Sequence, residues 1–355
     1  MEPSARHPGP DVVRALAMLG VLLINYHGYL ILRGGRRDGG AVYDFFDPWN
    51  GPLATRFAAT FVLTAGVGVT LLTNSSLGDA TRRTEMRWLL VRRGLLLYAG
   101  GLLFDFVWQG TILPFYGAMF VLAAGIFTLR TRWVVAIGVG AALAGWLINW
   151  WRYEHTLDGN PPDWLTDSGP RSPRGLLFDV FVNGTHPLLP WLIFLCAGIV
   201  LGRLLTTSWW RPAATGTGFA LYTAAQLAAA SARSDRWIVV LSDDPWDRGV
   251  AYAASALGTA LLAFTGISWL AERFRATRPI DVLRRAGQMS LSIYLAHALV
   301  FNLLVDELEL VEPGGLTTAL VMTGVFWVTA IAAAGWYQRR YGRGPAELLY
   351  RRLTA

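Results

Sequence analysis

Apolar residues dominate this chain in repeated runs of about 20 residues, the length that crosses a bilayer as one helix. Short polar segments rich in Gly, Pro, Asp and Arg separate the runs. The pattern predicts an all-α polytopic membrane helix bundle with about ten transmembrane helices. The predicted spans are residues 12–32, 53–73, 88–108, 112–129, 133–151, 187–205, 213–231, 249–270, 287–305 and 316–336.

The composition agrees with a membrane location. Hydrophobic residues make up 54% of the chain and charged residues only 15%, whereas a soluble domain has about 25% charged residues. This excludes a soluble nucleic-acid binder, although the net charge is +7. We predict one integral-membrane domain over residues 1–355, multi-pass in the plasma (inner) membrane, with lipids as neighbours. A homodimer is an open alternative to a monomer.

The arginines predict the orientation, because cytoplasmic loops carry an excess of positive charge. With the N-terminus inside, 21 of the 31 basic residues and 7 of the 24 acidic residues fall on the cytoplasmic side. Arg33, Arg36 and Arg37, in the first outside loop, are the exception. Both termini are therefore expected to be cytoplasmic.

The outside loops are the least generic part of the sequence. The first contains Asp47, Trp49 and Asn50, side chains suited to binding a sugar, although Trp at a loop edge also fits the interfacial aromatic belt. A long extracytoplasmic loop is predicted at about residues 152–186. Its last part, 175–186, is semi-apolar and suggests an interfacial or re-entrant stretch.

The first span carries polar side chains at both of its ends. Arg14 and Asn25 are eleven residues apart, three whole turns within about 20°, and Tyr29 shares their face. An amide inside hydrocarbon is costly without partners, so this face should point into the protein or a cavity. Asp11 and Arg14 at the cytoplasmic boundary are either a helix start with a snorkelling arginine or a contact for an anionic ligand.

Three of the five histidines are candidates for acid–base chemistry: His27, His186 and His297. His27 is rotated about 200° from Asn25, so it leaves the Arg14 face while the helix stays regular. His186 precedes Pro187, and His297 shares a helix face with Ser290 and Tyr294 at mid-membrane depth. The structural alternative for His27 is an interfacial side chain with a water partner, and that for His186 is a helix-entry residue packed under the prolines. For His297 it is an intramembrane imidazole bonded to Ser or Tyr of a neighbouring helix. His7 is expected to lie in a flexible N-terminal tail and to have no role, and His155, in the long outside loop, is expected to be solvated.

Other catalytic patterns do not occur in the sequence. There is no Gly-rich phosphate loop, no HExxH or CxxC pattern and no GxSxG elbow. The single Cys196 allows no internal disulfide. No metal site is predicted.

Several segments carry a family resemblance in the same order along the chain. DVVRALAMLGVLLIN, residues 11–25, resembles the first helix of the transmembrane acyltransferase superfamily, which includes heparan-alpha-glucosaminide N-acetyltransferases, acyltransferase family 3 and YeiB-like proteins. ILPFYGAMFVLAAG, THPLLPWLIFLCAGIVLGR, GQMSLSIYLAH and WYQRRYGRGPAELLYR are similar to YeiB-like proteins.

Two positions depart from the related branches. Asn25 stands where acyltransferase family 3 has a catalytic His. The W-N-G of Trp49 to Gly51 is similar to the heparan acetyltransferase pattern, in which a catalytic His comes shortly before it, but this chain has Phe45, Phe46 and Asp47 there. His27 or His186 would substitute for that His, or the chemistry differs.

The resemblance implies a membrane acyltransferase. It would take an acyl group, expected to be acetyl, from cytoplasmic acyl-CoA as co-substrate, and deliver it to a hydroxyl or amine of an extracytoplasmic sugar or lipid-linked glycan. Asp11, Arg14 and Tyr29 are the expected acyl-CoA contacts, with Asn25 at the thioester carbonyl.

Two alternatives from other classes stay open. The polar groups at membrane depth could line the path of a transporter or exporter of a small polar or glycan-linked molecule, although no inverted repeat supports this. The missing His before W-N-G also fits a non-catalytic membrane scaffold.

Overall fold

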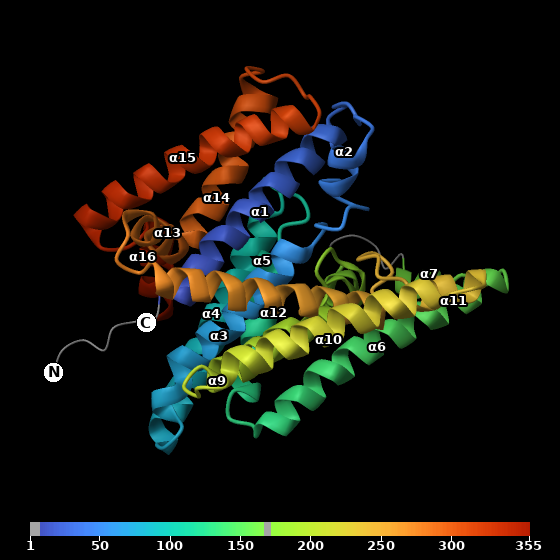
Figure 1. Cartoon of the computed structure of the whole chain (residues 1–355), viewed down its shortest axis with the longest axis horizontal. Helices are drawn as coiled ribbons and strands as arrows, with labels where there is room; N and C mark the ends of the chain where they lie inside the picture. Colours follow the sequence, from blue (N-terminus) through green and yellow to red (C-terminus); the bar gives the residue numbers. More distant parts are fainter. Residues whose placement is uncertain (1–7, 167–171) are drawn as a thin grey trace. The chain divides into compact units, whose positions relative to one another are not determined.

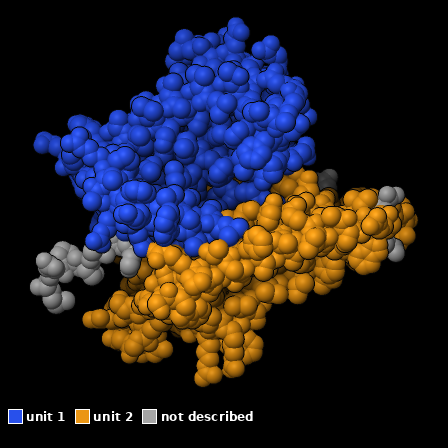
Figure 2. Space-filling model, viewed as in Figure 1, with its two compact units in different colours: residues 1–64, 260–353 blue, residues 65–259, 354–355 orange. Residues whose placement is uncertain are grey.

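The computed structural model describes residues 8–166 and 172–355, apart from the side chains of residues 235 and 236, so that His7 lies outside the described residues. These residues form helices and no strand, which confirms the all-α prediction. The chain divides into two compact units: unit 1 comprises residues 1–64 and 260–353, and unit 2 comprises residues 65–259 and 354–355 (Figure 2). Each unit is described below by itself, and the single-domain organisation stays a prediction.

Unit 1 contains the first helices of the chain and, up to residue 353, the last ones. Figure 1 labels these helices. Its helices are α1 (Gly9–Leu32), α2 (Ala41–Phe45), the first half of α3 (Arg56–Thr73), the second half of α12 (Val250–Arg273), α13 (Arg278–Gln288), α14 (Ser290–Phe301), the π-helical η3 (Asn302–Glu307), α15 (Leu316–Tyr341) and α16 (Pro345–Thr354).

Unit 2 holds the central part of the sequence. Besides the remaining parts of α3 and α12, its helices are η1 (Asn74–Ser76), α4 (Ala80–Phe104), α5 (Leu113–Ile126), α6 (Thr131–Leu157), α7 (Asp163–Thr166), α8 (Pro173–Phe178), the π-helical η2 (Asp179–Asn183), α9 (Leu188–Leu204), α10 (Trp210–Ser231) and α11 (Asp235–Val240).

Nine of the ten predicted spans each fall mainly on one helix, and the other, 287–305, covers the end of α13, α14 and part of η3. Among the described residues, six helical segments are long and apolar enough to cross a membrane: α1, α3 with η1, α6, α12, α14 with η3, and α15. A seventh results if residues 173–183 and 188–204, which meet at a 57° bend, form one broken span. The chain is a multi-pass membrane protein, while the exact number of spans and the side of the termini stay predictions.

The bent pair corresponds to the semi-apolar stretch for which an interfacial or re-entrant segment was expected. The long loop before it starts later than predicted, because α6 continues to Leu157. Residues 152–157 contain no helix breaker, and the first Gly and Pro residues follow at Gly159 and Pro161. The helix therefore ends where the chain first favours a turn.

α1 is the central helix of unit 1. It packs against α13, α14 and α15, and Val13, Leu22, Tyr26 and Leu30 are fully buried in it. The approach of α13 is close enough to require glycine: a Cβ atom on Gly287 would lie 1.8 Å from the carbonyl oxygen of Asp11. This contact sets the position of α13 against the first turn of α1.

The two ends of unit 1 differ in charge. α13 and α16 lie at the end where α1 begins and α15 finishes, and α2 lies at the other end (Figure 1). The arginines of α13, the last turn of α15 and α16 therefore gather at the first end, which the arginine distribution predicts to be cytoplasmic.

Unit 2 is built from helix pairs, chiefly α4 with α5 and α6 with α9. In the first pair, Cβ atoms on Gly94 or Gly117 would lie 2.6 Å from the other residue's carbonyl oxygen, so small residues permit backbone contact, as is common between membrane helices. In the segment before α12, Arg248 donates to the backbone carbonyls of Asn183 and Gly184, at 2.8 Å each. Arg248 thus holds that segment to the bend before α9.

Candidate functional site

His27 is hydrogen-bonded through one of its two ring nitrogens. Its side chain is fully buried, and its Nδ1 lies 2.9 Å from the carbonyl oxygen of Phe46, just after α2. Because a carbonyl oxygen only accepts, Nδ1 carries the proton, and in the neutral ring Nε2 keeps its lone pair. Among the described residues, Nε2 has no hydrogen-bond partner. The ring is held in one orientation with its basic nitrogen unused.

Tyr43 of α2 lies beside this imidazole. The two ring centroids are 5.2 Å apart with an interplanar angle of 87°, and Tyr43 is 7% exposed. Its hydroxyl is also buried with no partner in the described part of the chain. Two contacting side chains, His27 and Tyr43, thus each have a buried polar atom with no described hydrogen-bond partner.

The W-N-G segment forms a tight turn that continues from Phe46. The carboxylate of Asp47 accepts from the backbone N–H groups of Trp49 (2.9 Å) and Asn50 (2.7 Å), an Asx-type turn. The guanidinium of Arg37 lies 5.3 Å from the centroid of the Trp49 ring. Asp47 therefore shapes the turn, whereas Asn50 is exposed and Trp49 partly exposed at its surface.

Asn25 is on the opposite side of α1 from His27, as the rotation of about 200° requires. Its Nδ2 lies 3.3 Å from Nε2 of His297 on α14. Nδ1 of His297 donates to the carbonyl of Tyr294, so Nε2 accepts from the amide. The hydroxyl of Tyr26 donates to the His297 carbonyl at 3.0 Å. Both ring nitrogens of His297 are engaged, which fits a link between α1 and α14 better than a base.

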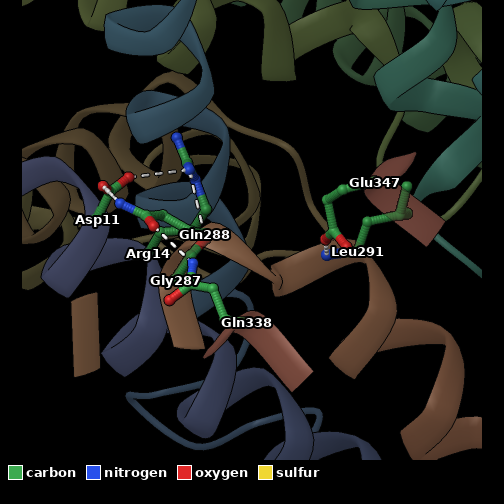
Figure 3. Close-up of polar contacts among 7 residues, drawn as sticks. All are labelled: Asp11, Arg14, Gly287, Gln288, Leu291, Gln338 and Glu347. Atoms are coloured by element: carbon green, nitrogen blue, oxygen red, sulfur yellow. Dashed lines mark hydrogen bonds and ion pairs between the residues drawn. The ribbon is translucent and has the colours of Figure 1, made fainter. Parts of the chain in front are cut away.

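Asp11 and Arg14 belong to a polar cluster between the start of α1, α13 and α15 (Figure 3). Arg14 lies 3.4 Å from both the Asp11 carboxylate and the Gly287 carbonyl, and Gln288 donates to Asp11 at 2.8 Å. Gln338 donates to Gln288, also at 2.8 Å. The Asp11 side chain is 5% exposed and that of Arg14 22%, and Gln288 and Gln338 are also partly exposed.

Glu347 lies beside this cluster at the start of α14 (Figure 3). One carboxylate oxygen accepts from the backbone N–H groups of Leu291 (2.8 Å) and Ser292 (3.1 Å), and the other accepts from the Ser292 hydroxyl. A carboxylate is favourable there because the first N–H groups of a helix lack partners and the helix dipole is positive at its N-terminus. α16 thus supplies the cap that α14 does not have in its own sequence.

Tyr29 lies near the far end of α1 from Arg14. Its ring meets Phe301 edge-on with centroids 6.1 Å apart, and the Arg33 guanidinium lies 5.6 Å from its centroid. Arg33 also forms a two-pronged ion pair with Asp306 of η3. One of the three arginines that oppose the predicted orientation is therefore neutralised. The acyl-CoA contact expected at Tyr29 stays a prediction.

His186 belongs to unit 2, whereas the other candidate histidines belong to unit 1. Its Nδ1 lies 2.9 Å from the Thr185 hydroxyl, and its ring packs edge-on against Trp191 with centroids 4.5 Å apart. It lies in the bend before α9. His155, on the last turns of α6, packs against Trp151 and lies 2.9 Å from its carbonyl oxygen through Nδ1.

The structure adds two residues that the sequence does not single out, Tyr43 and Gln288. Tyr43 lies three residues before Phe46 in a segment rich in aromatic side chains, which conceals its buried hydroxyl. Gln288 is the last residue of the hydrophilic helix α13, and only the packing of α13 on α1 brings it to Asp11. Within the described ranges, no group of three or more His, Cys, Asp or Glu is placed to hold a metal ion.

Two family models match the chain and overlap in its middle. Residues 6–238 match the model described as heparan-alpha-glucosaminide N-acetyltransferase, catalytic. Residues 202–355 match DUF418, described as a protein of unknown function. Comparison with curated proteins finds no match. The two family models confirm the resemblance that the sequence motifs predict.

Proposed function

Because the chain belongs to the heparan-alpha-glucosaminide N-acetyltransferase catalytic family, we propose that it moves an acetyl group from cytoplasmic acetyl-CoA to a sugar hydroxyl or amine, or to a lipid-linked glycan. Its membership makes it an acetyltransferase-like membrane protein. The donor, the extracytoplasmic acceptor and the residue roles below are the proposal.

The buried, unpartnered Nε2 of His27 is the observation that carries the proposal. The backbone that holds this imidazole, at Phe46, comes three residues before W-N-G. In the heparan-alpha-glucosaminide N-acetyltransferases that the sequence resembles, a catalytic His lies in this stretch. His27 of α1 can thus place its basic nitrogen near the loop position that holds a histidine in the related branch and Phe45, Phe46 and Asp47 in this chain.

The reaction needs two proton transfers at this nitrogen, one to it and one from it. His27 Nε2 takes the proton from the acceptor hydroxyl or amine as the acceptor attacks the thioester carbonyl carbon. The new C–O or C–N bond forms, the C–S bond breaks, and the imidazolium returns the proton to the departing CoA thiolate. The hydroxyl of Tyr43, buried beside His27, would hydrogen-bond the acceptor and orient it.

The acceptor would lie against the W-N-G turn. Asp47 keeps the turn closed, and Trp49 with Asn50 offers an aromatic face and an amide of the kind that bind sugars. Asn25 and His297 act on the other side of α1, where their hydrogen bond holds α1 against α14. We therefore assign them a positioning role and assign proton transfer to His27.

The donor would approach from the end of α1 that carries Arg14. Its guanidinium makes two long contacts of 3.4 Å, both through one nitrogen, and the side chain is 22% exposed. A guanidinium has five N–H donors, so donors would be left for a phosphate oxygen. The Asp11 carboxylate is adjacent, and its other oxygen accepts a hydrogen bond from the Gln288 amide. Arg14 is thus the proposed contact for the phosphates of acyl-CoA.

A transfer assay tests the proposal directly. Purified full-length protein in detergent is incubated with acetyl-CoA labelled in the acetyl group and a panel of amino sugars and neutral sugars. We expect labelled product with the wild type and loss of transfer in His27→Gln, with acetyl-CoA still bound. A wild type that neither binds acetyl-CoA nor labels any acceptor would overturn the proposal.

A further inference from the structure

A basic pocket lies at the predicted cytoplasmic end of unit 1, and none of the residues assigned to the reaction lines it. Arg14 lies at the same end and contacts Gly287 of α13, the helix that supplies part of the lining. It has a volume of about 630 Å³ and is lined by Arg275, Ala276, Thr277, Arg278, Asp281, Val282 and Arg339. The lining comes from the turn between α12 and α13, from α13 itself and from the last turns of α15. Arginines from segments about 60 residues apart in the sequence thus line the same pocket.

The charge of this pocket is largely uncompensated. Arg275, Arg278 and Arg339 are exposed, and none forms an ion pair with another described residue. The one acidic lining residue, Asp281, is held by Arg284 at 2.6 Å and by Arg285 at 2.8 Å. The negative charge of Asp281 is therefore neutralised by arginines outside the lining. The three lining guanidinium groups stay available for an anion in the pocket.

Guanidinium groups bind phosphate well, because their planar N–H donors match its oxygens in pairs. Two sources could supply such a phosphate: the headgroup of a membrane lipid or a soluble nucleotide. The surroundings favour the lipid. Large aromatic side chains are exposed next to the lining arginines in sequence, namely Phe274 (48%), Trp336 (61%) and Tyr341 (54%). Exposed Trp and Tyr at a helix end are typical of the level of lipid headgroups.

The amphipathic helix α13 also favours a lipid as the ligand. It combines Arg278, Arg284 and Arg285 with apolar Ile280 and Leu283, and it follows directly after the long apolar helix α12. A short basic amphipathic helix at the end of a span is suited to lie along an anionic membrane surface. We propose that this pocket binds the phosphate of an anionic phospholipid headgroup in the cytoplasmic leaflet.

Binding of a short-chain lipid to the full-length protein in detergent tests this site. Native mass spectrometry compares retention of dioctanoyl phosphatidylglycerol with dioctanoyl phosphatidylcholine. Arg275→Gln combined with Arg339→Gln removes two lining charges, and Arg82→Gln combined with Arg132→Gln removes two exposed charges from unit 2. We expect selective retention of phosphatidylglycerol, weakened about thirtyfold by the first pair, at about 1 kcal/mol for each arginine and 1.4 kcal/mol per tenfold. The control pair should change it less than twofold.

Several outcomes would overturn the assignment. These are equal retention of the two lipids, unchanged retention in the site variant, or an equal loss in the control variant. Displacement of the lipid by an equal concentration of adenosine 3′,5′-bisphosphate would make the site one for a soluble nucleotide and would also overturn it. If the double variant does not elute as a single species, Arg339→Gln alone serves, with an expected loss of about fivefold.

Discussion

The Nδ1 atom of His27 lies 2.9 Å from the carbonyl oxygen of Phe46, so a helix imidazole is anchored to the loop segment that precedes Trp49. The anchor determines the tautomer and leaves Nε2 as the basic atom. This one contact connects the first helix to the segment that leads into the W-N-G turn. Under the proposed function, Nε2 of His27 would act in place of the loop histidine of the related branch.

His27→Gln is expected to lower acetyl transfer by 10²–10⁴-fold, the range typical for loss of a general base. A glutamine amide can still donate to the Phe46 carbonyl, so the fold should persist. The measurement is the initial rate of transfer, with His155→Gln as the matched control for loss of an imidazole. Equal rates in the wild type and His27→Gln would show that another group is the base.

Tyr43→Phe separates a binding role of the hydroxyl from a structural one. Removing a buried hydroxyl that has no described partner should leave the thermal stability unchanged or slightly higher, because an unsatisfied polar group is lost. If the hydroxyl orients the acceptor, the KM for the acceptor rises severalfold while the KM for acetyl-CoA stays constant. A lower unfolding temperature with unaltered kinetics would indicate a structural role instead.

The pair Asn25 and His297 should show energetic coupling across α1 and α14. We expect the variants Asn25→Leu, His297→Leu and their combination to give a coupling of about 0.6–1.5 kcal/mol, as hydrogen bonds between membrane helices do. Unfolding in mixed micelles measures the three differences in stability. Additive effects would mean that the 3.3 Å contact contributes nothing specific to packing.

Glu347→Gln tests the cap that α16 places on α14. The amide oxygen can still accept one hydrogen bond, but the negative charge at the helix N-terminus is lost, so the protein should be less stable by about 0.5–2 kcal/mol. The effect should appear in the unfolding temperature and not in the KM values. Glu85 is an exposed residue of α4, so Glu85→Gln is the control and should have no measurable effect.

Asp281 predicts a pH dependence of stability. Hydrogen bonds from Arg284 and then Arg285 lower the pKa of its carboxyl below the usual value. A lowered pKa in the folded state adds stability above the unfolded-state pKa of about 3.9, and this contribution is lost as the pH falls through the folded-state pKa. The stability difference between the wild type and Asp281→Asn should be constant from pH 7 to about 5 and vanish at more acidic pH. A difference that grows on acidification would contradict the sign.

Sequence periodicity located most of the helices but not their ends. The run of apolar residues predicted α1 to within a few residues, whereas α6 continues beyond its predicted span because its last turns are polar but free of helix breakers. The rotation between Asn25 and His27 was predictable, since it depends only on helix geometry. The structure then shows different partners for the two side chains.

The sequence by itself determined the helical class, the membrane location and the family, because each depends on local composition, run length or ordered motifs. It also supplied the candidates His27, Asn25, Arg14 and His297. Only the tertiary structure decided which polar groups meet: His27 with Phe46, Asn25 with His297, and Asp11 with Gln288. Periodicity shows which face of a helix is polar, but the partner of that face is set by the packing of segments up to 277 residues apart.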